Sequence, residues 1–263
     1  MTSIYSALSK LEESGGVGAL CTIVWTQGST PRGAGSKMLV YPDGGFVGTV
    51  GGGALENRVV REALEAIGDG KPRKLSYKMD DPELGDPGVC GGQLEVFVEP
   101  IVPNPLLLVI GGGHVGKAVV HLGKWLGFRV AASDDRPEFC TPEALPEADE
   151  FHPIPMAELP QHVEITPWTS IVLTTRGADV DAIGLPALFE SDAAYIGVIG
   201  SRRRWATTVK LMQEAGVSQG KIERVHSPIG LELNAETPEE IAVSIMAEII
   251  MLRAGGDGKQ MSG

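Results

Sequence analysis

The sequence is poor in cysteine and in aromatic residues, and it carries no excess of positive charge. It has three cysteines in 263 residues and no Cys-x-x-Cys pair. An odd number of cysteines fits no closed set of disulfides. Acidic residues outnumber basic ones 34 to 22, which gives a formal net charge of −12. Such a chain lacks the basic field that attracts nucleic acids and anionic membranes, so we expect neither as a partner.

Long apolar runs are also missing. No run approaches the roughly 20 residues that span a bilayer, and no basic segment followed by an apolar one is typical of a secretory signal. The remaining composition is that of an ordinary globular protein, 43% hydrophobic with a mean hydropathy of +0.05. We therefore expect a soluble protein of the reducing cytoplasm.

A chain of this length predicts two domains, and clustered prolines indicate where they meet. Pro100, Pro103 and Pro105 lie close together, and proline interrupts both helices and sheets. The predicted fold class is α/β, with a small α+β domain followed by a Rossmann-type parallel-sheet domain. The expected parts are the N-terminal domain (1–99), a proline-rich linker (100–105), the Rossmann-like domain (106–255) and a flexible tail (256–263).

Short apolar or alternating runs predict the strands of both domains. Helices are expected between them, and Thr237, Pro238 and Glu240 have the spacing of a capping box that begins the last long helix. Its core side would carry Ile241, Ile245, Ile249 and Leu252. The expected strands are 18–26, 37–41, 46–50 and 94–98 in the first domain and 106–110, 128–133, 170–175 and 194–199 in the second.

The second domain opens with the pattern of a dinucleotide-binding unit. The apolar run 106–110 leads directly into Gly111-Gly-Gly-His-Val-Gly116, a helical stretch follows, and the next strand ends at Asp134. A G-x-G-x-x-G segment is weak evidence alone but much stronger between a strand and a helix. The context therefore predicts a Rossmann turn.

Each position of that turn has an expected role. Gly111 would permit the turn, Gly113 would let the backbone approach a pyrophosphate, and Gly116 would let the helix pack closely. Asp134 lies near the usual offset of the acid that binds ribose hydroxyls. His114 either contacts the ligand or faces solvent.

The segment Gly28-Ser-Thr-Pro-Arg-Gly-Ala-Gly35 joins two expected strands of the first domain. Its hydroxyls and guanidinium, with Ser29 and Arg32 as the candidate donors, could form an anion cradle on flexible backbone. The alternative is a plain turn whose backbone is set by Pro31.

Gly51, Gly52 and Gly53 immediately precede a predicted helix. Each glycine costs roughly 0.5–1 kcal/mol relative to alanine in regular structure, so the run needs a compensating gain. Close approach of an anionic ligand to the free N–H groups of the helix start would supply it. Glu56, in the first turn, either contacts that ligand or compensates the helix dipole.

Cys90-Gly91-Gly92 places a thiol on permissive backbone. A thiolate there could bind a soft metal or carry a sulfur atom. The alternative is an inert structural cysteine, which is what we expect of Cys21 inside a strand.

A second candidate anion site follows the last expected strand. Ser201 can cap a helix whose first turn contains Arg202, Arg203 and Arg204, the end at which the helix dipole disfavours cations. A bound anion would resolve this conflict, and so would acidic partners such as Asp179 or Asp181. The remaining histidines show no metal-ligand spacing.

Taken together, these segments resemble the XdhC/CoxI family of accessory proteins. The blocks occur in order over nearly the whole chain. Three of them, 28–32, 48–56 and 90–92, resemble the N-terminal domain of the family, and four, 111–116, 134–137, 197–202 and 238–242, resemble its C-terminal domain.

The resemblance implies a maturation factor for molybdenum hydroxylases such as xanthine dehydrogenase, without catalytic turnover of its own. Such a chaperone would bind the molybdenum cofactor (molybdopterin), assist exchange of an oxo for a sulfido ligand, and deliver the cofactor to the apo molybdenum hydroxylase. A cysteine desulfurase would supply the sulfur. The segments 48–56 and 90–92 become candidate pterin and molybdenum contacts, and a homodimer is compatible with this role.

One segment departs from the family. Its members often carry histidines in the loop after the third Rossmann strand of the C-terminal domain, whereas here the loop reads Thr174-Thr-Arg-Gly-Ala-Asp179. The Rossmann turn also leaves an alternative function, an NAD-dependent oxidoreductase with NAD(P) as ligand. The chain shows no Lys, Tyr or His proton donor at the spacing of a Rossmann enzyme.

Overall fold

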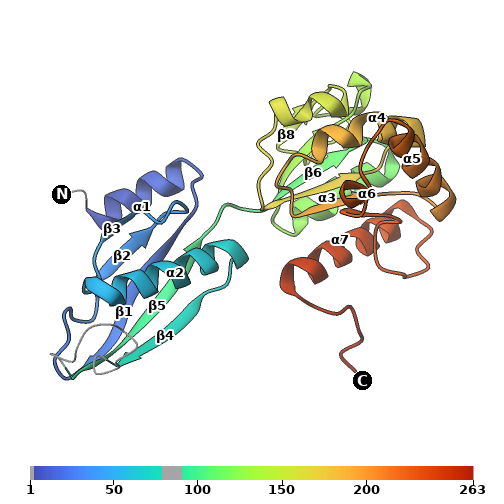
Figure 1. The fold of residues 1–263 in the computed structure, drawn as a ribbon. Helices are drawn as coiled ribbons and strands as arrows, with labels where there is room; N and C mark the ends of the chain where they lie inside the picture. Colours follow the sequence, from blue (N-terminus) through green and yellow to red (C-terminus); the bar gives the residue numbers. More distant parts are fainter. Residues whose placement is uncertain (1–2, 79–90, 263) are drawn as a thin grey trace. The chain divides into compact units, whose positions relative to one another are not determined.

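The computed structural model describes residues 3–78 and 91–262. The chain forms two compact units, Met1–Pro103 and Asn104–Gly263, each with its own hydrophobic core (Figure 1). The first has an antiparallel sheet and the second a parallel one, so the predicted α/β class is confirmed. In the described part of the chain, no helix is both long enough and apolar enough to cross a membrane.

The N-terminal unit is a five-stranded antiparallel sheet in the order β3-β2-β1-β5-β4 with two helices. Its elements are α1 (Ile4–Glu13), β1 (Gly18–Gln27), β2 (Lys37–Val40), β3 (Phe46–Gly48), α2 (Gly53–Asp69), β4 (Arg73–Lys78) and β5 (Gln93–Ile101).

The two helices of this unit pack on opposite faces of the sheet. Val59 and Ala63 of α2 belong to the same fully buried cluster as Ile23 of β1. Leu11 of α1 instead packs with Leu39 of β2. Because successive side chains of a strand point to opposite faces, α2 covers one whole face while α1 covers only the β2–β3 side of the other.

Strand β5 runs further than expected. It continues to Ile101 and includes Pro100, so the expectation that the prolines end the strand at residue 98 is wrong. The reason lies in the pairing. Strand β4 accompanies β5 only as far as Val98, and beyond it β5 is an edge strand with β1 alone as neighbour. A proline without an N–H is tolerated there.

The C-terminal unit is a six-stranded parallel sheet in the order β11-β10-β9-β6-β7-β8. Counted within the unit this is the 3-2-1-4-5-6 order of the Rossmann fold. Its elements are β6 (Leu106–Ile110), α3 (His114–Trp125), β7 (Arg129–Ser133), η2 (Pro137–Phe139), β8 (Glu150–His152), η3 (Met156–Gln161), β9 (Thr169–Leu173), α4 (Ala178–Leu188), β10 (Tyr195–Val198), α5 (Arg202–Glu214), α6 (Gln219–Ile222), β11 (Val225–His226) and α7 (Pro238–Ala254).

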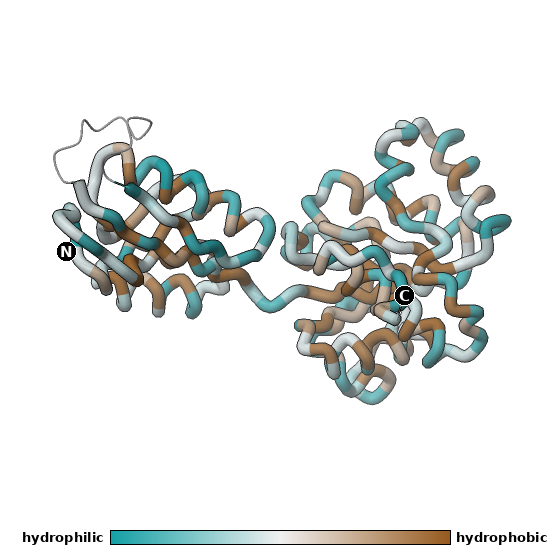
Figure 2. The backbone as a smooth tube through the Cα atoms, turned by 90° about the horizontal axis from the view of Figure 1, so that it is seen from below, coloured by the Kyte–Doolittle hydropathy of each residue, from teal (hydrophilic) through white to brown (hydrophobic). Residues whose placement is uncertain are grey.

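Helices cover both faces of this sheet. Leu107 and Val109 of β6 face α3 and α7, while Leu108 and Ile110 face η3, α4 and α5. Strands buried on both sides need apolar residues at every position rather than alternation. In Figure 2, brown hydrophobic segments accordingly run through the middle of each unit.

The predicted start of α7 is confirmed. The Thr237 side chain accepts a hydrogen bond from the Glu240 N–H at 3.2 Å, and the Glu240 carboxylate accepts one from the Thr237 N–H at 3.1 Å. Ile245 and Ile249 are buried as expected, whereas Leu252 is 44% exposed and was wrongly assigned to the core. It lies in the last helical turn, past the buried side chains.

A polar network ties α7 to the edge of this sheet. The Tyr195 hydroxyl donates to Glu248, and the Gly230 N–H donates to the same carboxylate at 2.8 Å. The His226 ring stacks on Tyr195 with 4.8 Å between ring centroids. Burial alone raises the pKa of Glu248, but hydrogen bonds from His226 and Tyr195 outweigh it and hold the pKa below its usual value.

This network predicts a pH dependence. Because the folded-state pKa is depressed, ionised Glu248 stabilises the fold above its unfolded pKa of about 4.3, and the contribution is lost as pH falls through the folded pKa. Glu248→Gln should lower the unfolding free energy of this unit by about 1 kcal/mol at pH 7 and by less at pH 3. Urea unfolding at both pH values measures this, with exposed Glu239→Gln as control. Equal effects at both pH values would contradict it.

Candidate functional site

Three of the glycine-rich segments meet at one end of the N-terminal unit, beside the start of α2 (Figure 1). We call this region the glycine end; it comprises residues 28–35, 48–56 and 91–92. Ser29 and Gly91 form a β-bridge, and a Cβ atom on Gly92 would lie 2.1 Å from the Ser29 carbonyl oxygen. The backbones therefore approach to a distance that only glycine allows.

The second and first segments are also in contact. A Cβ atom on Gly51 would lie 2.7 Å from the Pro31 side chain. Gly51, Gly52 and Gly53 have φ values of 147°, 89° and 61°, a region that disfavours other residues. Gly52 is the N-cap of α2 and offers no side chain to the helix start. The glycines thus bring bare backbone to the positive end of a 17-residue helix.

Glu56 accepts hydrogen bonds from this loop and stabilises it. The Thr49 hydroxyl donates to its Oε1 at 2.5 Å, and the Val50 N–H donates to the same oxygen at 3.3 Å. The Gly51 N–H in turn donates to the Thr49 hydroxyl at 3.2 Å. The Glu56 carboxylate therefore fixes the conformation of the loop through these hydrogen bonds. Its negative charge also interacts favourably with the positive end of the helix dipole.

Ser29 and Arg32 lie exposed in the first segment, where the Thr30 hydroxyl donates to the Arg32 carbonyl at 3.0 Å. Cys90 lies outside the described residues; its neighbour Gly91 is within them. Cys21 is fully buried, and burial raises its pKa to about 12, so it remains a protonated, unreactive thiol.

In the C-terminal unit the Rossmann turn is closely packed. A Cβ atom on Gly111 would lie 2.6 Å from the Thr174 carbonyl oxygen of the neighbouring β9 loop, and one on Gly116 would lie 1.8 Å from the Gly111 carbonyl oxygen. Gly113, the N-cap of α3, has nothing within 4 Å of that position. The first and third glycines are therefore fixed by packing, and the middle one borders open space.

Asp134 is engaged inside the protein rather than open to a ribose. Its side chain is 3% exposed. The Gly112 N–H donates to Oδ2 at 2.9 Å, and the Arg136 guanidinium pairs with both oxygens at 2.9 Å. The carboxylate links the glycine turn to the end of β7. A ligand that needs this carboxylate must first displace Arg136, which also lies over the Phe139 ring.

A crevice of about 270 Å³ lies at the carboxyl ends of β6, β7 and β9, and its walls include Gly111 and Asp134. It borders the point where the strand order reverses, the usual ligand position in such sheets. Arg176 pairs with Asp135 across it at 2.5 and 2.7 Å, and this hydrogen bond lowers the pKa of Asp135. The loop 174–179, which lacks the histidines often found in the XdhC/CoxI family, thus contributes an arginine, Arg176, to the wall of the crevice.

The start of α5 resolves the charge conflict seen in the sequence. The Ser201 hydroxyl caps the helix by accepting from the Arg204 N–H at 3.2 Å. The Arg204 guanidinium pairs with fully buried Asp181 at 2.7 Å and donates to the Thr175 carbonyl at 3.0 Å. For Arg204 the acidic partner, rather than a bound anion, is therefore the explanation. Arg202 lies exposed at the first helical position.

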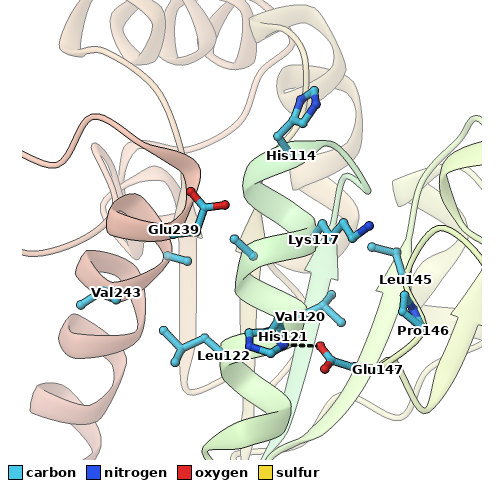
Figure 3. A pocket seen from close by; sticks show the side chains of 12 residues that line it. His114, Lys117, Val120, His121, Leu122, Leu145, Pro146, Glu147, Glu239 and Val243 are labelled. Atoms are coloured by element: carbon cyan, nitrogen blue, oxygen red, sulfur yellow. Dashed lines mark hydrogen bonds and ion pairs between the residues drawn. The ribbon is translucent and has the colours of Figure 1, made fainter.

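A second pocket of this unit, of about 450 Å³, lies between α3 and α7 (Figure 3). Apolar side chains such as Val120 and Leu145 line it, and His121 contacts Glu147 at 2.6 Å on its rim. Figure 3 shows His114 at the N-terminus of α3, with its ring pointing away from the apolar lining. Within the described residues, no group of three or more His, Cys, Asp or Glu side chains could hold a metal ion.

The strand order and the glycine turn define the C-terminal unit as a Rossmann-type domain. Residues 107–249 match the family model described as XdhC Rossmann domain, and residues 11–78 match the XdhC and CoxI family. The chain belongs to the XdhC and CoxI family, as its motifs predicted.

Similar proteins match nearly the whole chain. It is 35% identical over 98% of its length to Uncharacterized protein YqeB of Escherichia coli and spans 48% of that protein. It is 26% identical to a probable xanthine dehydrogenase subunit of Bacillus subtilis, over 96% of this chain and 98% of the relative. It is 24% identical to the Molybdenum cofactor insertion chaperone PaoD of E. coli, over 91% and 85%. A crystal structure of a xanthine dehydrogenase from Bacillus halodurans shares the fold, with a TM-score of 0.51, 24% identity and coverage of 98% and 97%.

The packing of the Rossmann turn is open to a direct test. Gly116→Ala should destabilise the C-terminal unit by about 1–3 kcal/mol, because the new methyl group would collide with a carbonyl of the turn itself. Gly113→Ala is the matched control, since its φ of −71° suits alanine and the space around it is open. Thermal unfolding followed by circular dichroism compares the two. Equal melting temperatures would contradict the packing role of Gly116.

Proposed function

We propose that the chain is an accessory chaperone that binds the molybdenum cofactor and helps to insert it into a molybdenum hydroxylase such as xanthine dehydrogenase. The observation that carries this proposal is the convergence of three separate glycine-rich segments at the start of α2. The names of two relatives, one a chaperone for this cofactor and the other part of a xanthine dehydrogenase, support it.

The residues of the glycine end suit such a ligand. Molybdopterin carries a phosphate, and a helix start with bare N–H groups attracts phosphate through its aligned dipoles. The glycines at 51–53 expose that helix start, and Arg32 adds a guanidinium that can pair with phosphate oxygens. Ser29, Gly91 and Gly92 complete the set of candidate contacts.

The same proposal extends to sulfuration. Cys90 directly precedes Gly91 in the sequence, and Gly91 is bridged to Ser29 at the glycine end. A thiolate there suits molybdenum or a transferred sulfur atom. A cysteine desulfurase would be the sulfur donor, and the apo hydroxylase would be the acceptor of the finished cofactor.

The Rossmann crevice supports a second, weaker candidate, an NAD-dependent oxidoreductase. The strand order and the glycine turn favour a nucleotide there. Asp134, however, is already paired with Arg136 and Gly112. No Lys, Tyr or His is found among the described residues that line the crevice, so a proton donor for hydride chemistry is not at hand. The chaperone is therefore the better-supported function.

Cofactor loading tests the proposal. Protein reloaded with molybdenum cofactor and separated by gel filtration should retain molybdenum and pterin, measured by mass spectrometry and by fluorescence after oxidation. Arg32→Glu should retain about tenfold less, because it replaces a cation beside the phosphate site with an anion. Arg61→Glu, an exposed position further along α2, makes the same change in net charge and should load normally. Failure of the unmodified protein to retain either component would refute the proposal.

The thiol is tested separately. Cys90→Ser should leave folding and cofactor retention largely intact but reduce activation of the client hydroxylase, because serine cannot carry sulfur or bind a soft metal. A reconstituted maturation assay with a cysteine desulfurase measures this, and Cys21→Ser, at the buried thiol, checks that the effect is specific. Full activation by Cys90→Ser would exclude the thiol from the process.

A further inference from the structure

Part of the sheet in the N-terminal unit, next to the glycine end, is not covered by a helix. The pairing register places Trp25 of β1, Glu95 of β5 and Ser76 of β4 side by side in one row. Residues directly opposite in neighbouring strands have Cβ atoms about 4.5–5.5 Å apart. An indole therefore lies beside a carboxylate on the face opposite α2.

The irregularity in β1 exposes this indole. The pairing with β5 shifts between Ile23 and Trp25, which leaves Val24 as an extra residue in β1. Ile23 is fully buried against α2, whereas Trp25 is 41% exposed on the other face. A bulge re-aims side chains in this way and is frequent at binding sites.

These side chains border a pocket of about 510 Å³, within the usual size range of small-molecule sites. Its lining mixes one large aromatic surface with groups of both charges and several hydrogen-bonding side chains. The residues are Trp25, Arg58, Ser76, Tyr77, Lys78, Gln93, Leu94 and Glu95.

One polar group of this lining, the carboxylate of Glu95, can accept a further hydrogen bond. The Lys74 ammonium binds Oε2 of Glu95 at 2.9 Å, and Oε1 accepts no hydrogen bond from the described residues. Tyr77 and Leu94 also border the pocket, but they belong to the core on the α2 face of the sheet, where the Arg58 guanidinium lies over the Tyr77 ring.

We propose that this pocket binds the pterin ring of the cofactor, an inference that rests on the proposed chaperone function. A pterin is a flat bicyclic ring whose pyrimidine edge presents an N–H and an amino group side by side. The indole of Trp25 offers a stacking surface for the ring, and the carboxylate of Glu95 accepts hydrogen bonds from that edge.

The position relative to the glycine end fits a ligand with a ring at one end and a phosphate at the other. Trp25 lies three residues before Gly28, a distance of about 10 Å along an extended chain. The phosphate would lie at the glycine end and the ring at the pocket.

Binding of small ring compounds tests the pocket apart from the cofactor. Unmodified protein should bind pterin and quench its fluorescence, and it should bind lumazine more weakly, because lumazine has an oxo group in place of the amino group. Trp25→Ala should weaken pterin binding roughly tenfold, and Trp25→Phe should retain most of it, because both indole and phenyl rings offer a face on which the pterin can stack. Glu95→Gln should remove the preference for pterin over lumazine.

Phe97→Ala is the matched control, since Phe97 is 37% exposed one row away on the same strand and does not line the pocket. Unchanged pterin binding in Trp25→Ala and Glu95→Gln would overturn the inference, even if the protein retains molybdenum. Stronger binding of GMP, which has the same pyrimidine edge, would also overturn it by showing a guanine site. Pterin binding that depends on Trp25, in a protein that never retains molybdenum, would support the pocket and refute the chaperone function.

Discussion

A Cβ atom at Gly92 would lie 2.1 Å from the Ser29 carbonyl oxygen, and one at Gly116 would lie 1.8 Å from the Gly111 carbonyl oxygen. Close contact between backbones at glycine is the constraint on which both units depend. In the N-terminal unit it lets three distant segments meet beside one helix start. In the C-terminal unit it lets the first turn of α3 pack directly against the glycine turn that precedes the helix. Any side chain at these positions would push the segments apart and remove the exposed N–H groups.

The two units use their charged side chains differently. In the C-terminal unit, buried Asp134 pairs with Arg136, Arg204 pairs with buried Asp181, and Asp135 pairs with Arg176 across the crevice. These pairs fix the loops that follow the strands. In the N-terminal unit, Arg32 and Trp25 are exposed beside the glycine end.

Much of the fold could be predicted because the signals are local. Strand β6 has the predicted bounds, since its apolar run is bounded by Pro105 and Gly111. The capping box of α7 could be predicted for the same reason, because all its atoms belong to four consecutive residues. Strands β4, β8 and β11 were not expected. The last two have three and two residues, too few for a periodic pattern, and each pairs with a longer strand.

The sequence by itself determined where the glycines, caps and buried strands fall, because those depend on neighbouring residues and on the allowed backbone angles. It also indicated the family, whose motifs are short and contiguous. Only the tertiary structure decided which side chains pair. It assigned Asp181 to Arg204, engaged Asp134 with Arg136, and placed Trp25 beside Glu95. Such pairs join residues that are far apart in the chain, or they depend on the register between strands. The spacing of neighbouring residues in the sequence predicts neither long-range contacts nor register.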